Sequence, residues 1–227
     1  MKRALLNLYK GGGCCFVSND AMKAFVDQMK SFSSVLLVTS LIGCGFKSDK
    51  LIDYSNLIAS NGQLLCDNGF LDFADSIDQD HLRKNLIASF DIYSTENFKI
   101  VHIDAEELVE YNFNFFIPRL SQLLERRGFE LDVRVASDYE NTNDIYINGT
   151  KVNLYTKRDL ENGSFWDSGP RKFFKEINTQ LASRNVSELF YLLYDGNDLH
   201  TILLTPAQHS IIESNYKYNQ REIPYLP

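Results

Sequence analysis

The sequence predicts an α/β protein in which a mixed central sheet is flanked by helices. Apolar runs of strand length alternate along the chain with segments whose apolar residues recur at helical spacing, a pattern typical of this fold class. Two pairs of strand-like runs are joined by Asn148-Gly149 and by Gly196-Asn197, residue types that favour tight hairpin turns. The 227 residues are 44% hydrophobic and 23% charged, which provides enough apolar chain for a sizeable core.

Residues 1–110 are expected to form an N-terminal α/β region, either separate from residues 111–227 or continuous with them. Strand-like segments at residues 3–9 and 14–18 flank Gly11-Gly12-Gly13. That glycine run lacks the Lys-Ser/Thr of a phosphate loop and is interpreted as a permissive turn. The predicted elements that follow are a helix from Asp20 to Phe32 and a strand, covered on both faces, over Ser34–Ile42.

Two more helices are predicted before residue 110. The first spans residues 49–60 and is expected to end at Asn61-Gly62, because these residue types favour the left-handed conformation that terminates helices. The second spans residues 79–90, with Asp78 as its N-cap. A strand over residues 98–103 is then followed by a helix with acidic residues in its first turn, where the positive end of the helix dipole favours them.

Residues 111–227 form the C-terminal region and carry the clearest turn signals. The run FELDVRVA alternates apolar and polar residues, as a strand with one buried face does. In chain order the predicted elements are a helix near Pro118, the strand 129–136, hairpin strands 144–147 and 150–155, a helix over 169–184, hairpin strands 188–194 and 199–205, and a helix from Pro206 to Tyr216.

The order helix, strand, hairpin, helix, strand from residue 113 resembles the αβββαβ core of the restriction-endonuclease-like, or PD-(D/E)xK, nucleases. The resemblance covers about half of the chain and is topological. It places Asp144 where the family has a metal-binding Asp at the start of the second strand. The family's carboxylate-x-Lys motif falls on Asn153-Leu154-Tyr155, which departs from the pattern.

The resemblance implies a metal site in altered form. Some family members carry a carboxylate on the following helix, so Asp144 and Glu176 would hold Mg²⁺ and Lys157 would stabilise the phosphate charge. The implied protein is a variant or inactive nuclease that works in nucleic-acid processing or in defence against foreign DNA. Asp144 equally suits the common structural role of an Asp that accepts backbone amides at a hairpin.

A basic and aromatic segment follows the predicted hairpin. Arg158, Trp166, Arg171 and Lys172 combine cations with an aromatic ring, a pattern that suits nucleic-acid backbone contact and base stacking. The alternative is a solvated loop that packs one tryptophan. Residues 158–170 show no clear periodicity, so they are expected to form a loop.

A second function hypothesis rests on charge. The formal net charge is -7, which suits a partner with a basic surface better than nucleic acid. Asp138, Tyr139, Glu140, Asp144 and Tyr146 bring carboxylates and aromatic rings together near the hairpin, as an interface with a basic protein would. An immunity or inhibitor protein, or a subunit of a larger complex, fits this pattern, and so does a plain acidic turn.

The cysteines and histidines predict structural roles. Cys14, Cys15, Cys44 and Cys66 lie in apolar contexts, which favours reduced core thiols and a cytoplasmic protein. The four histidines lack metal-ligand spacing, although His102 and Asp104 share a strand end. The sequence has no signal-peptide pattern and no apolar run long enough to span a bilayer, so no membrane partner is expected.

Overall fold

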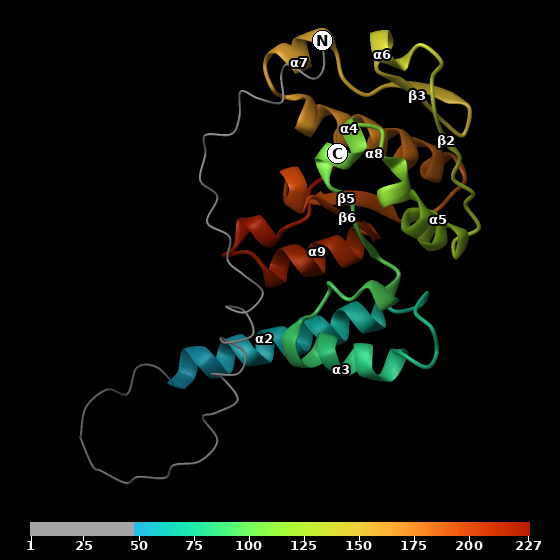
Figure 1. Ribbon diagram of the computed structural model, residues 1–227. Helices are drawn as coiled ribbons and strands as arrows, with labels where there is room; N and C mark the ends of the chain where they lie inside the picture. Colours follow the sequence, from blue (N-terminus) through green and yellow to red (C-terminus); the bar gives the residue numbers. More distant parts are fainter. Residues whose placement is uncertain (1–47) are drawn as a thin grey trace. The chain divides into compact units, whose positions relative to one another are not determined.

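Helices and short strands alternate from residue 48 to the C-terminus (Figure 1). The computed structural model describes residues 48–227, with side chains from Ser55 onward. The following predictions lie outside the described residues: the strands at residues 3–9, 14–18 and 34–42, the glycine turn, the helix from Asp20 to Phe32, and the surroundings of Cys14, Cys15 and Cys44.

The first half of the described chain is mostly helical. Its elements are α2 (Ser48–Asp67), α3 (Gln79–Ser89), β1 (Ile100–His102), α4 (Ala105–Val109) and α5 (Ile117–Glu125). Helices α3 and α4 begin differently, and Asp78 of α3 is the N-cap that was predicted. Asp104 accepts from the backbone amides of Glu106 and Glu107, whereas Asp78 stands at the N-cap position of α3 without a capping bond from its side chain.

The second half contains both predicted hairpins. Its elements are β2 (Val133–Val135), α6 (Tyr139–Thr142), β3 (Asp144–Ile147), β4 (Thr150–Asn153), α7 (Lys157–Glu161), α8 (Phe165–Ser183), β5 (Leu189–Leu193), β6 (His200–Leu204) and α9 (Pro206–Asn215). Thr205 and Gln208 form a capping box at the start of α9, which explains why this helix begins at Pro206 as predicted.

The described strands form two antiparallel sheets, in the orders β1-β6-β5 and β2-β3-β4. The α/β class is therefore as predicted. The predicted single mixed sheet is wrong, because the described strands form two separate antiparallel sheets. Four consecutive residues of β5 and of β6 are buried, so both strands need cover on both faces. The outer strand β4 exposes Thr150, Lys151 and Asn153 to solvent. This polar edge strand does not pair with β5.

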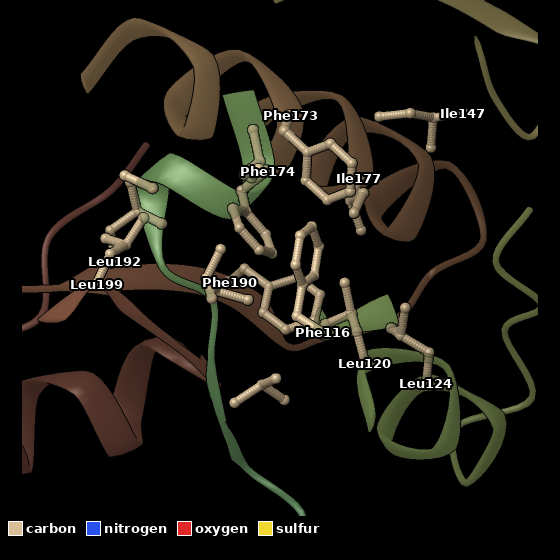
Figure 2. Close-up of a cluster of buried hydrophobic side chains, with 14 of the residues drawn as sticks. Phe116, Leu120, Leu124, Ile147, Phe173, Phe174, Ile177, Phe190, Leu192 and Leu199 are labelled. Atoms are coloured by element: carbon tan, nitrogen blue, oxygen red, sulfur yellow. The ribbon is translucent and has the colours of Figure 1, made fainter. Parts of the chain in front are cut away.

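Alternate residues of the β1-β6-β5 sheet enter two hydrophobic cores. Phe190 and Leu192 face a core shared with α4, α5 and α8, whereas Tyr191 and Leu193 face a core shared with α2, α3 and α9. Helices thus cover both faces of this sheet (Figure 1). Ile145 and Ile147 of the second sheet are also buried members of the first core, together with the side chains of α8. Figure 2 shows this core, in which labelled side chains from α5, α8 and β5 converge, with Ile147 of β3 at its margin.

The described residues, 48–227, belong to one compact unit. Strand β1 comes from the predicted N-terminal region and pairs with β6 of the C-terminal region, with Val101 opposite Thr201. The C-terminal tail completes the sheet, because Tyr225 exchanges two backbone hydrogen bonds with Leu192 at the free edge of β5.

Helix α2 continues through Asn61-Gly62, so the predicted end at these residues is wrong. Gly62 is buried, and a Cβ atom there would lie 2.6 Å from the Leu86 carbonyl carbon and 2.8 Å from Ile87 Cα of α3. The Asn61 side chain donates to the Asn215 side chain of α9 at 3.2 Å. Asn61 and Gly62 therefore contact other helices from within α2, and these tertiary contacts outweigh the preference of both residue types for helix ends.

The loop predicted over residues 158–170 is also wrong, because α7 and the first turns of α8 occupy it. Thr156 and Asp159 form a capping box that begins α7. Pro170 is the sixth residue of α8, and Gly169 before it packs closely on Val109 of α4. Glycine and proline here mark a close helix contact, although in sequence they resemble a loop signal.

Candidate functional site

The hairpin turn has the predicted conformation. Asn148 and Gly149 have φ values of 49° and 84°, as a type I′ turn requires. The Asn148 side chain accepts from the Asp132 amide at 2.7 Å and donates to Gln180 of α8 at 2.9 Å. The turn is therefore fixed to both neighbouring elements, and it sets the register of every side chain on β3 and β4.

The Asp144 carboxylate is buried at the start of β3, opposite Asn153. Lys151 Nζ lies 2.7 Å from one carboxylate oxygen, and Asn153 Nδ2 donates to the other at 3.0 Å. The hydrogen bond from Lys151, helped by Asn153, holds the pKa of Asp144 below its ordinary value. Asp144 is thus an ionised carboxylate whose charge and lone pairs already have partners.

Glu176 is not beside Asp144. Successive strand residues point to opposite faces, and α8 covers the face that carries Ile145 and Ile147. Asp144 belongs to the other face, with Tyr146. Glu176 accepts from Gln180 at 2.8 Å, and Gln180 in turn donates to the Ile147 carbonyl at 3.0 Å. The structure does not bring together the two carboxylates that were expected to share a metal ion.

Lys157 is exposed on the first turn of α7 and pairs with Glu161 across one helical turn, at 3.7 Å. The chain leaves β4 and enters α7 through the Thr156 cap, so Lys157 no longer follows the strand. The structure thus gives Lys157 and Asp144 separate partners, and Lys151 on β4 provides the cation at Asp144. The residue expected to stabilise phosphate charge is not part of that site.

The four residues predicted to contact nucleic acid lie on α7 and α8. Trp166 packs on Phe165 with ring centroids 4.3 Å apart, which agrees with the alternative prediction that this segment packs its tryptophan. Arg171 Nε lies 2.8 Å from both Asp167 carboxylate oxygens, and Lys172 Nζ lies 3.6 Å from Asp159. Arg158 is exposed on α7. Acidic residues therefore interleave with this basic segment and neutralise much of its charge.

A cavity of about 570 Å³ opens beside Trp166. Its apolar wall is Pro170 of α8 together with Leu192 and Leu199 of the second hairpin. Tyr225 of the tail forms another wall, held by the Leu192 backbone pairing and by donation from its hydroxyl to the Tyr194 carbonyl at 2.9 Å. Burial raises the pKa of Tyr225, which keeps this hydroxyl protonated as a donor.

Acidic groups dominate the charge around this cavity. Asp167 and Asp195 line it, and its described lining contains no Lys or Arg side chain. Asp195 stands at the N-cap position of a short 3₁₀ helix, Gly196–Asp198, but its side chain makes no capping bond. Asn197, which also lines the cavity, contacts Glu106 of α4 at 3.5 Å. The cavity thus combines aromatic walls with a negative rim.

A second cavity, of about 500 Å³, lies over a buried ion cluster. Glu188 accepts from Lys99 and from Arg127, and the three side chains are at most 7% exposed. Burial opposes ionisation of Glu188, but Arg127 and Lys99 outweigh it and hold its pKa below the ordinary value. Burial lowers the pKa of Lys99, against the pull of Glu188. Glu188 is thus the shared counter-charge of two cations, and the cluster links the start of β1, the end of α5 and the start of β5.

Among the described residues, one three-residue group has the ligand types of a metal site. Atoms of Asp78, His81 and Glu96 lie within 4.8 Å of one another. His81 and Glu96 pair directly at 3.0 Å, which accounts for this contact without an ion. The group is distant in sequence from the expected Mg²⁺ ligands, and it contains neither of them.

Comparison with known proteins adds no family to this geometry: no family model matches the sequence, and no curated protein or solved structure is detectably similar to it. Within residues 48–227, none of the helices combines the length and the apolar character needed to traverse a bilayer.

Sequence reasoning missed Asp195 and Tyr225 as site residues. Each reaches the cavity only because the second hairpin and the tail meet α8, and no local pattern marks that meeting. Lys99 and Glu188 were missed for the same reason. A lysine inside the apolar run FKIVHI was the one available signal, since a charge within a buried strand requires a partner.

Proposed function

We propose that this chain is a non-enzymatic acidic binding protein, either an inhibitor or immunity protein or a subunit of a larger complex, whose partner presents a basic surface. The observation that carries the proposal is the ion pair between Lys151 and Asp144. It occupies the carboxylate on which any metal-dependent nuclease chemistry would depend.

The geometry around Asp144 argues against a resident Mg²⁺ ion. Mg²⁺ takes hard oxygen ligands in near-octahedral geometry and is bound most often by one or two carboxylates. At Asp144 the neighbours are an ammonium and an amide NH₂, which are donors that compete with a cation for the same oxygens. Glu176 faces the other side of β3 and is engaged by Gln180.

The distribution of charge supports a basic partner. Residues 55–110 contain eleven Asp and Glu side chains against three Lys and Arg side chains, of which Lys99 is buried. Most of this excess negative charge lies in the segment between α2 and α3 and on or beside α4, whereas α3 itself carries one acidic and two basic side chains. Such a concentration attracts a positively charged surface and repels nucleic acid.

The second candidate function is that of a variant or inactive restriction-endonuclease-like protein in nucleic-acid processing or defence. The element order favours it, since α5, β2, β3, β4, α8 and β5 follow the αβββαβ order of that family, with the short helices α6 and α7 inserted between them. Mg²⁺ binding at Asp144 would then require that Lys151 move away. A cytoplasmic location is part of both proposals, and the free buried thiol of Cys66 supports it.

A cleavage assay separates the two candidates. The wild-type chain and Asp144→Ala are incubated with single- and double-stranded DNA and with RNA, in Mg²⁺ or Mn²⁺. We expect no cleavage above a no-protein blank from either protein. Metal-dependent cleavage that disappears in Asp144→Ala and persists in Asp138→Ala, an exposed acidic control nearby, would overturn the binding-protein proposal.

A further inference from the structure

We propose that the cavity beside Trp166 receives an arginine side chain from the basic partner. This inference rests on the proposed function and names the contact by which the partner is recognised. The cavity combines three features that a guanidinium requires: unpaired negative charge, aromatic walls and sufficient volume.

Asp195 supplies the charge. Among the described residues its carboxylate has neither a hydrogen-bond partner nor an ion-pair partner, although it lies on the cavity wall. Asp167 shares the wall but is engaged by Arg171. An entering cation would therefore meet Asp195 first, within an acidic rim that extends to Glu106 through Asn197.

Trp166 and Tyr225 supply the aromatic walls. Cations are attracted to the faces of such rings, and Trp is the strongest partner. The chain already shows this chemistry with its own arginine: the Arg171 guanidinium lies 4.9 Å from the centroid of the Tyr225 ring while it pairs with Asp167. A second guanidinium, bound between Trp166 and Asp195, would likewise contact one aromatic ring and one carboxylate.

The cavity volume of about 570 Å³ is within the ~300–1,000 Å³ typical of small-ligand sites, which is enough room for one side chain. Arginine fits better than lysine, because its planar guanidinium is weakly hydrated, stacks on aromatic rings and binds carboxylates with two parallel hydrogen bonds. An anionic guest such as a phosphate is disfavoured, because the unpaired Asp195 carboxylate would repel it and the Asp167 carboxylate is already paired with Arg171.

Trp166 is the only tryptophan of the chain, so its fluorescence reports directly on the cavity. The full-length protein is titrated with a Gly/Ser-rich peptide that carries one arginine, and with the same peptide in which neutral citrulline replaces the arginine. We expect a saturable change in Trp166 emission with the arginine peptide and a weak response to the citrulline peptide.

Asp195→Asn tests the site itself. Loss of a charge-assisted hydrogen bond should weaken arginine-peptide binding roughly tenfold. Asp198→Asn is the control: it removes the same charge from the same hairpin loop and, like Asp195, Asp198 is exposed, but it does not line the cavity and lies 3.9 Å from the Arg221 guanidinium. Binding to Asp198→Asn should remain within about twofold of wild type.

The outcomes separate this inference from the proposed function. If basic peptides bind without a change in Trp166 emission, or if Asp195→Asn binds as tightly as wild type, the cavity assignment is wrong and the binding-protein proposal stands. If Trp166 responds as expected while the chain cleaves nucleic acid through Asp144, the cavity assignment stands and the proposed function is wrong. Equal responses to arginine and citrulline would also overturn the assignment.

Discussion

Alanine at Gly62 sets two effects on stability against each other. In an exposed helix interior, alanine stabilises by about 0.5–1 kcal/mol relative to glycine. Gly62 lies inside α2 but against α3, where a Cβ atom would overlap the Leu86 carbonyl oxygen and lie 2.6 Å from its carbon. Backbone atoms cannot rotate away as a flexible side chain does, so the two helices would have to separate.

Overpacking of this kind costs ~1–3 kcal/mol, and the helix preference of alanine offsets up to ~1 kcal/mol, so we expect a net loss of about 1–2 kcal/mol in the free energy of unfolding. The measurement is urea unfolding followed by far-UV circular dichroism. Ser60→Ala, at an exposed position two residues earlier, is the control and should be neutral or slightly stabilising. A Gly62→Ala protein as stable as Ser60→Ala would refute the close contact between α2 and α3.

Three other perturbations test the fold and the hairpin. Glu188→Gln leaves two buried cations without a counter-charge and should lower the free energy of unfolding by about 3–5 kcal/mol, measured by the same urea assay. The folded-state pKa values of Asp144 and Glu188 are depressed, so their stabilisation is complete above their ordinary pKa values of 3.8 and 4.5 and is lost as the pH falls below them. Thermal melts from pH 6 to pH 3 should show this loss, with a flatter profile in Glu188→Gln; a pH-independent melting temperature would contradict it. Gly149→Ala should cost about 1–2 kcal/mol because φ is 84° there, whereas Gly→Ala at a position with negative φ and open space would cost little; an unchanged midpoint would exclude the type I′ turn.

Local chemistry was sufficient to predict much of the described fold. The Asn148-Gly149 turn needs positive φ at two consecutive residues, and few other residue pairs permit that conformation. Helix α9 carries its own start signal in Thr205, Pro206 and Gln208. In such segments the determinants lie within a few residues of one another, so a sequence pattern identifies them.

Long-range contacts decided what the sequence did not predict. Gly62 and Asn61 resemble a helix end until α3 and α9 are seen to pack on them. Whether β5 joins β4 or a separate sheet depends on which edge is buried, and neither strand specifies that alone. The expected metal pair, Asp144 and Glu176, came from a resemblance in element order, but α8 packs on the Ile145 and Ile147 face and so separates them.

The cavity could be predicted only in part. Trp166 and Arg171 stood out in the sequence, and the structure places both at or beside the cavity wall. Their chemical surroundings were not apparent, because Asp195 and Tyr225 arrive from elements about 25 to 60 residues further along the chain. With Asp195 and Tyr225 in the wall, the ligand that we propose is a cation, whereas the sequence had suggested the phosphate backbone of a nucleic acid.

The decisive measurement for a binding protein with a basic partner is an anisotropy titration of a fluorescent arginine-rich peptide with the full-length chain, at low and high salt, with duplex DNA or RNA as competitor. We expect saturable peptide binding that weakens as the salt concentration rises. We also expect that the nucleic acid does not compete with the peptide for the binding site on the protein. Absence of peptide binding at low salt, with tight binding of the nucleic acid by the chain itself, would contradict the proposed function.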